Sequence, residues 1–188
     1  TSTEVYDIAA TAFRTVFALP DPGWRWAFTI PQADATFLAL DLHHVSDFGT
    51  TFQSCHDYRR GSEQFDWFDA QTLAASTGFV VTLMNEKSSC RALEQGAWHA
   101  MISRGTLCVT GFGYFAERAV ESDGFPYYNT CAAKPGDVYR DVKAAVCERV
   151  SSYMLFTFDR AAGRMTAELK RLDGSVIDRQ TYPRRRSL

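Results

Sequence analysis

Several features that would point to a particular class of protein are missing from this sequence of 188 residues. No apolar run approaches the roughly 20 residues that a membrane-spanning helix needs, and no basic segment followed by an apolar one opens the chain. The net charge of −2 predicts neither a nucleic-acid partner nor a membrane partner. Internal repeats and low-complexity segments are also missing, so we expect residues 1–188 to form a single domain.

The cysteines exclude two further classes of protein. None of the five lies in a C-x-x-C pair, so neither a zinc ribbon nor a thioredoxin-type motif is expected. Five is an odd number, which rules out full internal pairing, and Cys108 lies in an apolar run typical of a buried thiol. These features leave the compartment open and favour a soluble protein in the reducing cytosol. The basic run Arg184 to Arg186 is predicted to be a solvated tail.

Hydrophobic periodicity predicts the elements of the first third. Apolar residues at helical spacing indicate a helix over residues 6–17, which the prolines and glycine of "LPDPG" end. "WRWAFTI" alternates strictly and places Trp24, Trp26, Phe28 and Ile30 on one face of a half-buried strand. The more apolar "ATFLALDL" follows after a short turn. We expect these two strands to form an antiparallel pair.

A helix is predicted within "SEQFDWFDAQTLAAS". Ser62 has the side chain and the position of an N-cap, and acidic residues follow in the first turns. Phe65, Phe68 and Leu73 form an apolar stripe that would face the core. Gly78 is expected to close this helix.

The rest of the chain predicts an α/β domain with an antiparallel addition. "FVVTLM" and "GTLCVTG" are typical of buried strands, and a second helix is expected over residues 91–102 with Gly96 inside it. Strand, helix, strand, helix and strand in this order indicate a partly parallel sheet flanked by helices. Three later strands, turned at residues 161–163 and 173–174, predict a C-terminal antiparallel meander.

Polar side chains gather in the long loop of residues 43–61, after a predicted strand. Ligands bind beyond the carboxyl ends of the strands in such sheets, and a loop of this length inside a compact domain is typical of a functional segment. Histidine and carboxylate are suitable ligands for zinc, manganese or iron, although the spacing matches no standard motif. Ordinary hydrogen-bonded loop residues are the alternative. The candidate metal ligands are His43, His44, Asp47 and His56, with Asp41 and Asp57 beside them.

Three further candidates lie near the ends of the later strands and on the second helix. Asn85 and Glu86 directly follow a predicted buried strand, and they are candidates for catalysis or for capping the next helix. His99 is the remaining histidine, and packing within its helix is the alternative to a catalytic role. The turn "GFGYF" could bring backbone N–H groups close to an anion, but it lacks the pattern of a phosphate-binding loop.

Taken in chain order, these segments resemble the C-terminal half of the calcineurin-like metallophosphoesterases, including the purple-acid-phosphatase type. The resemblance covers most of the chain as an ordered set of loose patterns. It implies a metallophosphoesterase-like sandwich and a site for two metal ions. The segments that carry it are "LPDPG", "FLALD", "QFDWFDAQTLAAS", "FVVTLM", "VTGFGYFAER" and "GRMTAELKRLDGSVIDRQTY".

The chain departs from the family at the metal ligands. A histidine of the family follows the strand matched by residues 79–84, where this chain has Asn85. Phe112 and Tyr114 replace the two histidines of the family's later motif, and neither can act as imidazole does at neutral pH. An alternative alignment on residues 96–99 would retain His99 but places the motif in a predicted helix. The later motif falls on Gly111, Phe112, Tyr114, Glu117 and Arg118.

The resemblance leaves two functions open. The first is a degenerate or partial metallophosphoesterase-like domain with a non-catalytic role in binding or structure. The second is the C-terminal chain of an active metal-dependent phosphoesterase, whose other ligands would lie on an N-terminal segment preceding Thr1 or on a partner chain. Asn85, Glu86, His43 and His44 would then complete a site for manganese, iron or zinc and a phosphoester substrate. An accidental resemblance remains a third interpretation.

Overall fold

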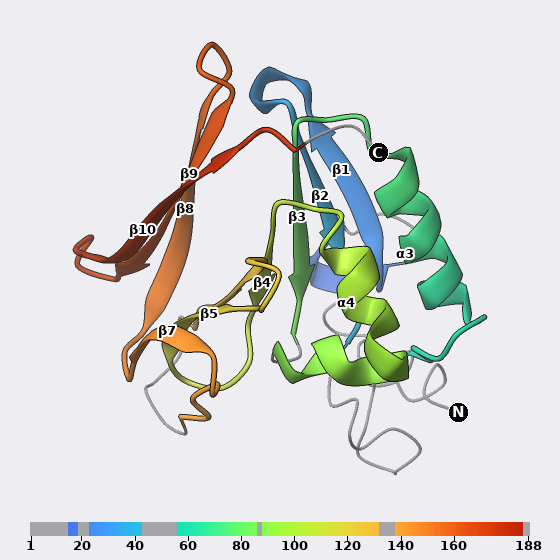
Figure 1. Cartoon of the computed structure of the whole chain (residues 1–188), viewed down its shortest axis with the longest axis horizontal. Coiled ribbons are helices and arrows are strands. Elements are labelled where there is room, and N and C mark those ends of the chain that lie inside the picture. Colours follow the sequence, from blue (N-terminus) through green and yellow to red (C-terminus); the bar gives the residue numbers. More distant parts are fainter. Residues whose placement is uncertain (1–14, 19–22, 43–55, 86–87, 132–137, 186–188) are drawn as a thin grey trace.

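The computed structural model of the chain describes residues 15–18, 23–42, 56–85, 88–131 and 138–185 (Figure 1). These residues form three layers: two α-helices, a seven-stranded sheet in the middle and a three-stranded sheet on its other face. The α-helices are α3 (Glu63–Ala74) and α4 (Ala97–Ile102), and 3-10 segments cover Pro31–Ala33 and Ser88–Gly96. No helix in these ranges is long and apolar enough to cross a membrane.

The seven-stranded sheet has the strand order β1-β2-β3-β4-β6-β5-β7. β2, β3, β4 and β6 are mutually parallel, while β1 and β5 run antiparallel to their neighbours. The carboxyl ends of the four parallel strands therefore share one edge. The strands are β1 (Trp26–Ile30), β2 (Ala35–Ala39), β3 (Phe79–Met84), β4 (Leu107–Thr110), β5 (Ala116–Val120), β6 (Pro126–Asn129) and β7 (Ala144–Glu148).

The C-terminal strands form a separate antiparallel sheet of order β10-β9-β8. Their bounds are Ser152–Asp159 for β8, Arg164–Arg171 for β9 and Val176–Pro183 for β10. This sheet confirms the predicted meander and both of its turns. It packs on the face of the larger sheet that α3 and α4 leave uncovered (Figure 1). The two described α-helices thus cover one face, whereas the sequence had suggested helices on both.

Alternating residues of the central strands bury both faces of the larger sheet. On β3, Val80 packs into the core beneath α3 and α4, while Phe79 and Val81 pack against the three-stranded sheet. Cys108 on β4 points to the helical side and is a buried thiol, which confirms the prediction for this residue. Trp98 of α4 is fully buried in the same core. Burial on both faces explains why these strands read as continuous apolar runs.

Most predicted elements of the first half are confirmed. β1 and β2 pair antiparallel, and the Ser62 hydroxyl accepts a hydrogen bond from the N–H of Phe65 at the start of α3. The apolar stripe is only partly right, because Phe68 is buried whereas Leu73 is 56% exposed. α3 also ends at Ala74, so Gly78 does not close it. The predicted helix over residues 6–17 lies almost wholly outside the described residues.

The strand face predicted from Trp24 to Ile30 is less buried than its alternation suggested. β1 begins at Trp26, and Trp24 precedes it. Phe28 stacks on Phe37 of β2 with 4.8 Å between the ring centroids, yet it remains 41% exposed. The physical reason is that β1 is the last strand of the sheet and has a neighbour on one side only.

The second predicted helix, residues 91–102, is interrupted. Leu93 is extended, and Glu94 and Gln95 have φ of 51° and 58°, which an α-helix does not allow. Gly96, with φ of 84°, is the N-cap of α4 rather than an interior residue. A positive φ favours glycine, so Gly96, which was predicted to lie inside a longer helix, marks the start of the shorter helix α4.

Candidate functional site

The turn after β4 is held by an asparagine from the neighbouring strand. Asn129, at the end of β6, is 3% exposed, and its Oδ1 accepts hydrogen bonds from the Thr110 hydroxyl (2.8 Å) and the Phe112 N–H (3.0 Å). Its Nδ2 donates to the carbonyl of Phe115 at 2.7 Å. One buried amide therefore fixes both ends of the turn. Sequence reasoning missed β5, β6 and β7, although the aromatic run "FPYYN" after Gly124 was a signal for β6.

Phe112 and Tyr114, which the predicted resemblance would match to two histidines, carry aromatic rings at the carboxyl edge. The Phe112 ring lies 5.8 Å from that of Tyr139, and Tyr114 is 41% exposed. Asn85 lies beside this turn, since a Cβ atom at Gly111 would sit 3.5 Å from its Oδ1. The structure thus brings Asn85 and the turn together. Glu86 lies outside the described residues.

The two charged residues of the motif lie within β5 and bond inside the protein. Glu117 is 2% exposed, and its Oε2 accepts the N–H of Asp141 at 2.8 Å. The Arg118 guanidinium binds the carboxylate of Asp178 on β10 through two hydrogen bonds of 2.8 and 3.2 Å. Burial opposes the charge of Arg118, but the bonds and the negative charge of Asp178 outweigh it and raise the pKa of Arg118. Both side chains therefore serve the packing of the sheets.

His56 is the one candidate metal ligand within the described residues. Its ring is buried and stacks on Trp24, with 3.8 Å between the centroids. Asp41 contacts the His56 Nδ1 at 2.6 Å and accepts its backbone N–H at 2.8 Å. Asp57 instead pairs with Arg59, whose hydrogen bond lowers the pKa of Asp57. His43, His44 and Asp47 lie outside the described residues.

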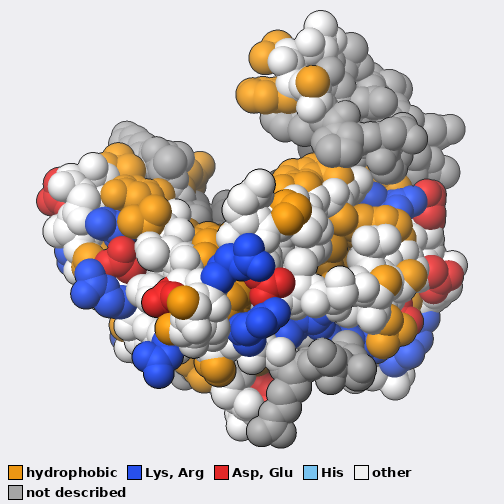
Figure 2. All heavy atoms as spheres, turned by 90° about the horizontal axis from the view of Figure 1, so that it is seen from above, with side chains coloured by type: hydrophobic (Ala, Val, Ile, Leu, Met, Phe, Trp, Pro, Cys, Tyr) orange, Lys and Arg blue, Asp and Glu red, His pale blue; other side chains and the backbone are white. Residues whose placement is uncertain are grey.

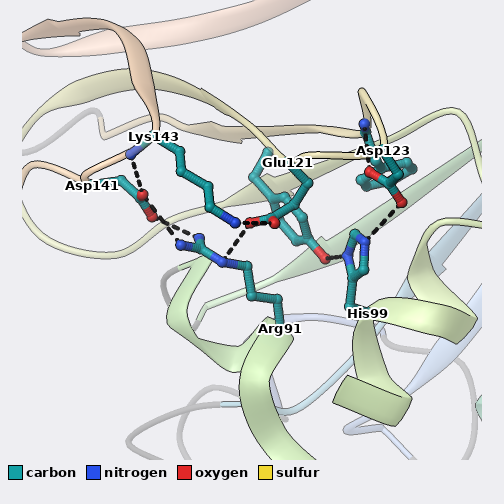
Figure 3. Close-up of polar contacts among 8 residues, drawn as sticks. Arg91, His99, Glu121, Asp123, Asp141 and Lys143 are labelled. Atoms are coloured by element: carbon teal, nitrogen blue, oxygen red, sulfur yellow. Dashed lines mark hydrogen bonds and ion pairs between the residues drawn. The ribbon is translucent and has the colours of Figure 1, made fainter. Parts of the chain in front are cut away.

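His99 lies between a buried phenol and a partly exposed carboxylate (Figure 3). Its Nδ1 is 2.8 Å from the Tyr127 hydroxyl, and its Nε2 is 2.9 Å from Oδ2 of Asp123. Burial opposes the charge of Asp123, but the N–H of Phe125 and the His99 ring outweigh it and lower the pKa of Asp123. Tyr127 is 2% exposed, so its hydroxyl is not open to a substrate. This chain of contacts joins α4 to the β5–β6 turn.

An ion-pair network lies beside the contacts of His99 with Tyr127 and Asp123 (Figure 3). Arg91, on the 3-10 segment before α4, binds Glu121 at 2.5 Å and Asp141 at 2.6 Å. Lys143 pairs with the same Glu121 carboxylate. Burial opposes the charge of Arg91, and the two carboxylates outweigh it and raise the pKa of Arg91. The network fastens the irregular 3-10 segment to the strands β5 and β7, and sequence spacing gave no sign of it.

The described residues do not provide the donor set of a metal centre. Within these ranges, no three histidine, cysteine, aspartate or glutamate side chains lie together as metal ligands. The two histidines that are described, His56 and His99, each contact a carboxylate and an aromatic ring. Phenylalanine has no ligand atom, and a phenol is protonated at neutral pH. A two-metal site therefore does not fit this part of the chain.

Comparisons with known proteins bear on the fold alone. No protein-family model matches the chain, and no curated protein matches it. Among solved structures, the chain is similar to GAP50, described as the anchor in the inner membrane complex of Plasmodium, with a TM-score of 0.56 and 12% sequence identity. The match covers 87% of this chain and 54% of that chain, so this chain spans about half the length of that protein.

Proposed function

We propose that this chain is a metallophosphoesterase-like domain with a non-catalytic role in binding or structure. The observation that carries the proposal is which side chains occupy residues 111–118 and what they contact. Phe112 and Tyr114 take the positions of the two histidines, while Glu117 and Arg118 bond to Asp141 and Asp178 inside the protein. Glu117 and Arg118, the polar residues of this motif, thereby stabilise the fold instead of lying open to a metal ion.

Metal content and turnover together test this proposal. The purified chain is incubated with manganese, iron or zinc and passed through a desalting column. Bound metal is then measured by mass spectrometry, and hydrolysis of bis(4-nitrophenyl) phosphate is followed. We expect substoichiometric metal and hydrolysis at the background rate. Stoichiometric metal together with turnover would overturn the proposal.

A variant that restores the two histidines tests the match at this turn. In F112H/Y114H, two imidazoles lie on the turn that Asn129 holds in place, so we expect more metal to be retained than in the wild type. F65H/Y153H, which places two histidines far apart on α3 and β8, is the control for added imidazole. Equal retention by the two variants would contradict the assignment of this turn.

The alternative function is the C-terminal chain of an active phosphoesterase that takes its other ligands from an N-terminal segment or a partner chain. The nearness of Asn85 to Gly111 favours it, because the ends of the neighbouring parallel strands β3 and β4 converge there and one of them carries a polar side chain. The same metal and turnover measurements, repeated on a longer natural chain that contains this one, decide between the two. Metal and turnover only in the longer chain would favour the alternative.

A further inference from the structure

A pocket of about 460 Å³ lies at the end of the sheet opposite to the turn at residues 111–115. It lies beside the loop that joins the end of α3 to the start of β3, so it is remote from the carboxyl ends of the parallel strands. Two arginines of the C-terminal segment form part of its wall. The lining residues outside α3 are Ala75, Ser76, Thr77, Gly78, Arg184 and Arg185.

Backbone hydrogen bonds place these two arginines. The Arg184 N–H donates to the carbonyl of Gly163 at 3.0 Å, and the Arg185 N–H donates to that of Gly78 at 2.9 Å. The Arg185 guanidinium also donates from Nε to the carbonyl of Thr77 at 2.9 Å. The basic run that the sequence predicted to be a solvated tail is therefore fixed at these two residues, and Arg186 lies outside the described residues.

Positive charge exceeds negative charge around the pocket. Arg184 pairs with Asp34 at 2.5 Å. Within the described part of the chain, no carboxylate pairs with Arg185, which bonds to carbonyl oxygens instead. Burial lowers the pKa of Arg185, although Asp34 acts in the opposite direction, so the surroundings do not fully compensate its charge. Arginine and lysine side chains gather near the middle of the face seen from above (Figure 2).

The loop on the other side of the pocket offers hydrogen-bond donors. In the described ranges, the N–H groups of Ser76, Thr77 and Gly78 donate to no protein acceptor. Ser76 is exposed and adds a hydroxyl. Consecutive backbone N–H groups and guanidinium groups are the donors that proteins use for phosphate oxygens.

We propose that this pocket binds a phosphate group. Two guanidinium groups, the loop N–H groups and the Ser76 hydroxyl offer more donors than the two oxygens of a carboxylate would use, whereas a tetrahedral dianion accepts from several directions. Its charge would also compensate Arg185. The site is independent of the proposed function, because it uses none of the residues at the carboxyl edge of the sheet.

Titration with phosphate, followed by amide NMR spectra of the whole chain at constant ionic strength, tests this site. We expect inorganic phosphate to shift the amide signals of residues 76–78 in a saturable manner, while chloride does not. R185Q should weaken binding by roughly tenfold or more, because a charge-assisted bidentate contact is lost. R149Q, which removes an exposed arginine elsewhere, should bind as the wild type does.

One further variant and one further ligand complete the test. R185K keeps the charge without the planar fork, so binding weaker than in the wild type is expected even if R185Q fails to fold. Glycerol phosphate in place of inorganic phosphate distinguishes an esterified ligand from the free ion by its tighter binding. The proposal is wrong if the wild-type signals of residues 76–78 do not move, or if R185K and R149Q bind equally well.

Discussion

At the scale of single residues, the two described histidines have similar surroundings. His56 contacts Asp41 and stacks on Trp24, and His99 contacts Asp123 and the Tyr127 hydroxyl. Each histidine joins two segments of the chain. Beside His99, burial opposes the charge of Asp123, but the N–H of Phe125 and the imidazole ring outweigh it and lower the pKa of Asp123. pH is therefore the variable that reveals what the contact between His99 and Asp123 contributes.

We expect D123N to lower the free energy of unfolding at neutral pH by about 0.5–1 kcal/mol, because it removes the charge beside His99 and keeps an acceptor for the Phe125 N–H. The pKa of Asp123 lies below its ordinary value of 3.8, so its contribution is present above that pH. It is lost as the pH falls through the lowered pKa. Urea unfolding at a series of pH values from neutral to acid measures this.

The control for D123N is D159N, which removes an exposed aspartate at the end of β8. The difference between D123N and the wild type should shrink as Asp123 becomes protonated in acid. A difference that stays constant from neutral to acid pH would show that the charge of Asp123 contributes nothing. The contact with His99 would then be incidental to stability.

At the scale of elements, the C-terminal segment after β10 links the three-stranded sheet to the larger sheet. It leaves the three-stranded sheet and crosses toward the end of α3 (Figure 1). Arg184 pairs with Asp34, which precedes β2, and passes close to Gly78, which precedes β3. Gly78 is glycine for lack of room, since a Cβ atom there would overlap the Asp34 carboxylate and the Arg184 side chain.

G78A should therefore destabilise the protein by up to about 1 kcal/mol, because the ends of the Asp34 and Arg184 side chains must shift and their partly exposed ion pair is weakened. The matched control is G111A, because a Cβ atom at Gly111 would make only an ordinary contact at 3.5 Å. Its effect should stay within about 0.5 kcal/mol. Chemical denaturation of both variants measures these changes. Equal stabilities of G78A and G111A would contradict the close packing of Gly78 against Asp34 and Arg184.

At the scale of the whole molecule, two polar contacts join the sheets beside the apolar core. Arg118 of β5 binds Asp178 of β10, and these side chains are 15% and 8% exposed. Next to them, the hydroxyl groups of Tyr128 and Tyr182 lie 2.7 Å apart. Burial raises the pKa of both phenols, so they remain protonated at neutral pH and one donates to the other.

Removing one partner of the buried pair should cost more than removing both. R118M leaves the Asp178 carboxylate buried and uncompensated, at a cost of about 3–5 kcal/mol. R118M/D178L removes both charges and should recover part of that loss. R179Q breaks the pair of Arg179 with Glu168, whose arginine is 63% exposed, and should cost about 0–1 kcal/mol. Urea unfolding of the three variants decides, and equal losses from R118M and R179Q would contradict the linking role.

The predictions from sequence succeeded where local pattern and burial agree. Apolar runs indicated β3 and β4, and the Ser62 cap indicated α3, because these signals lie within a few neighbouring residues. The interruption at Glu94 and Gln95 had no comparable signal, since their positive φ is stabilised by the surrounding fold. The strands β5 to β7 were missed although β5 and β6 form a hairpin, because β6 also pairs with β4 and β5 with β7, whose residues lie far away in the sequence.

By itself, the sequence determined an α/β domain with a parallel centre, an antiparallel C-terminal sheet and a buried Cys108. Its resemblance to a metal-binding motif at Phe112 and Tyr114 stays a prediction. Only the tertiary structure decided that Glu117 bonds to Asp141 and Arg118 to Asp178 inside the protein, and that Arg185 lines a pocket. The physical reason is that hydrophobic periodicity is local, whereas the partner of a charged side chain is chosen by the packing of distant segments.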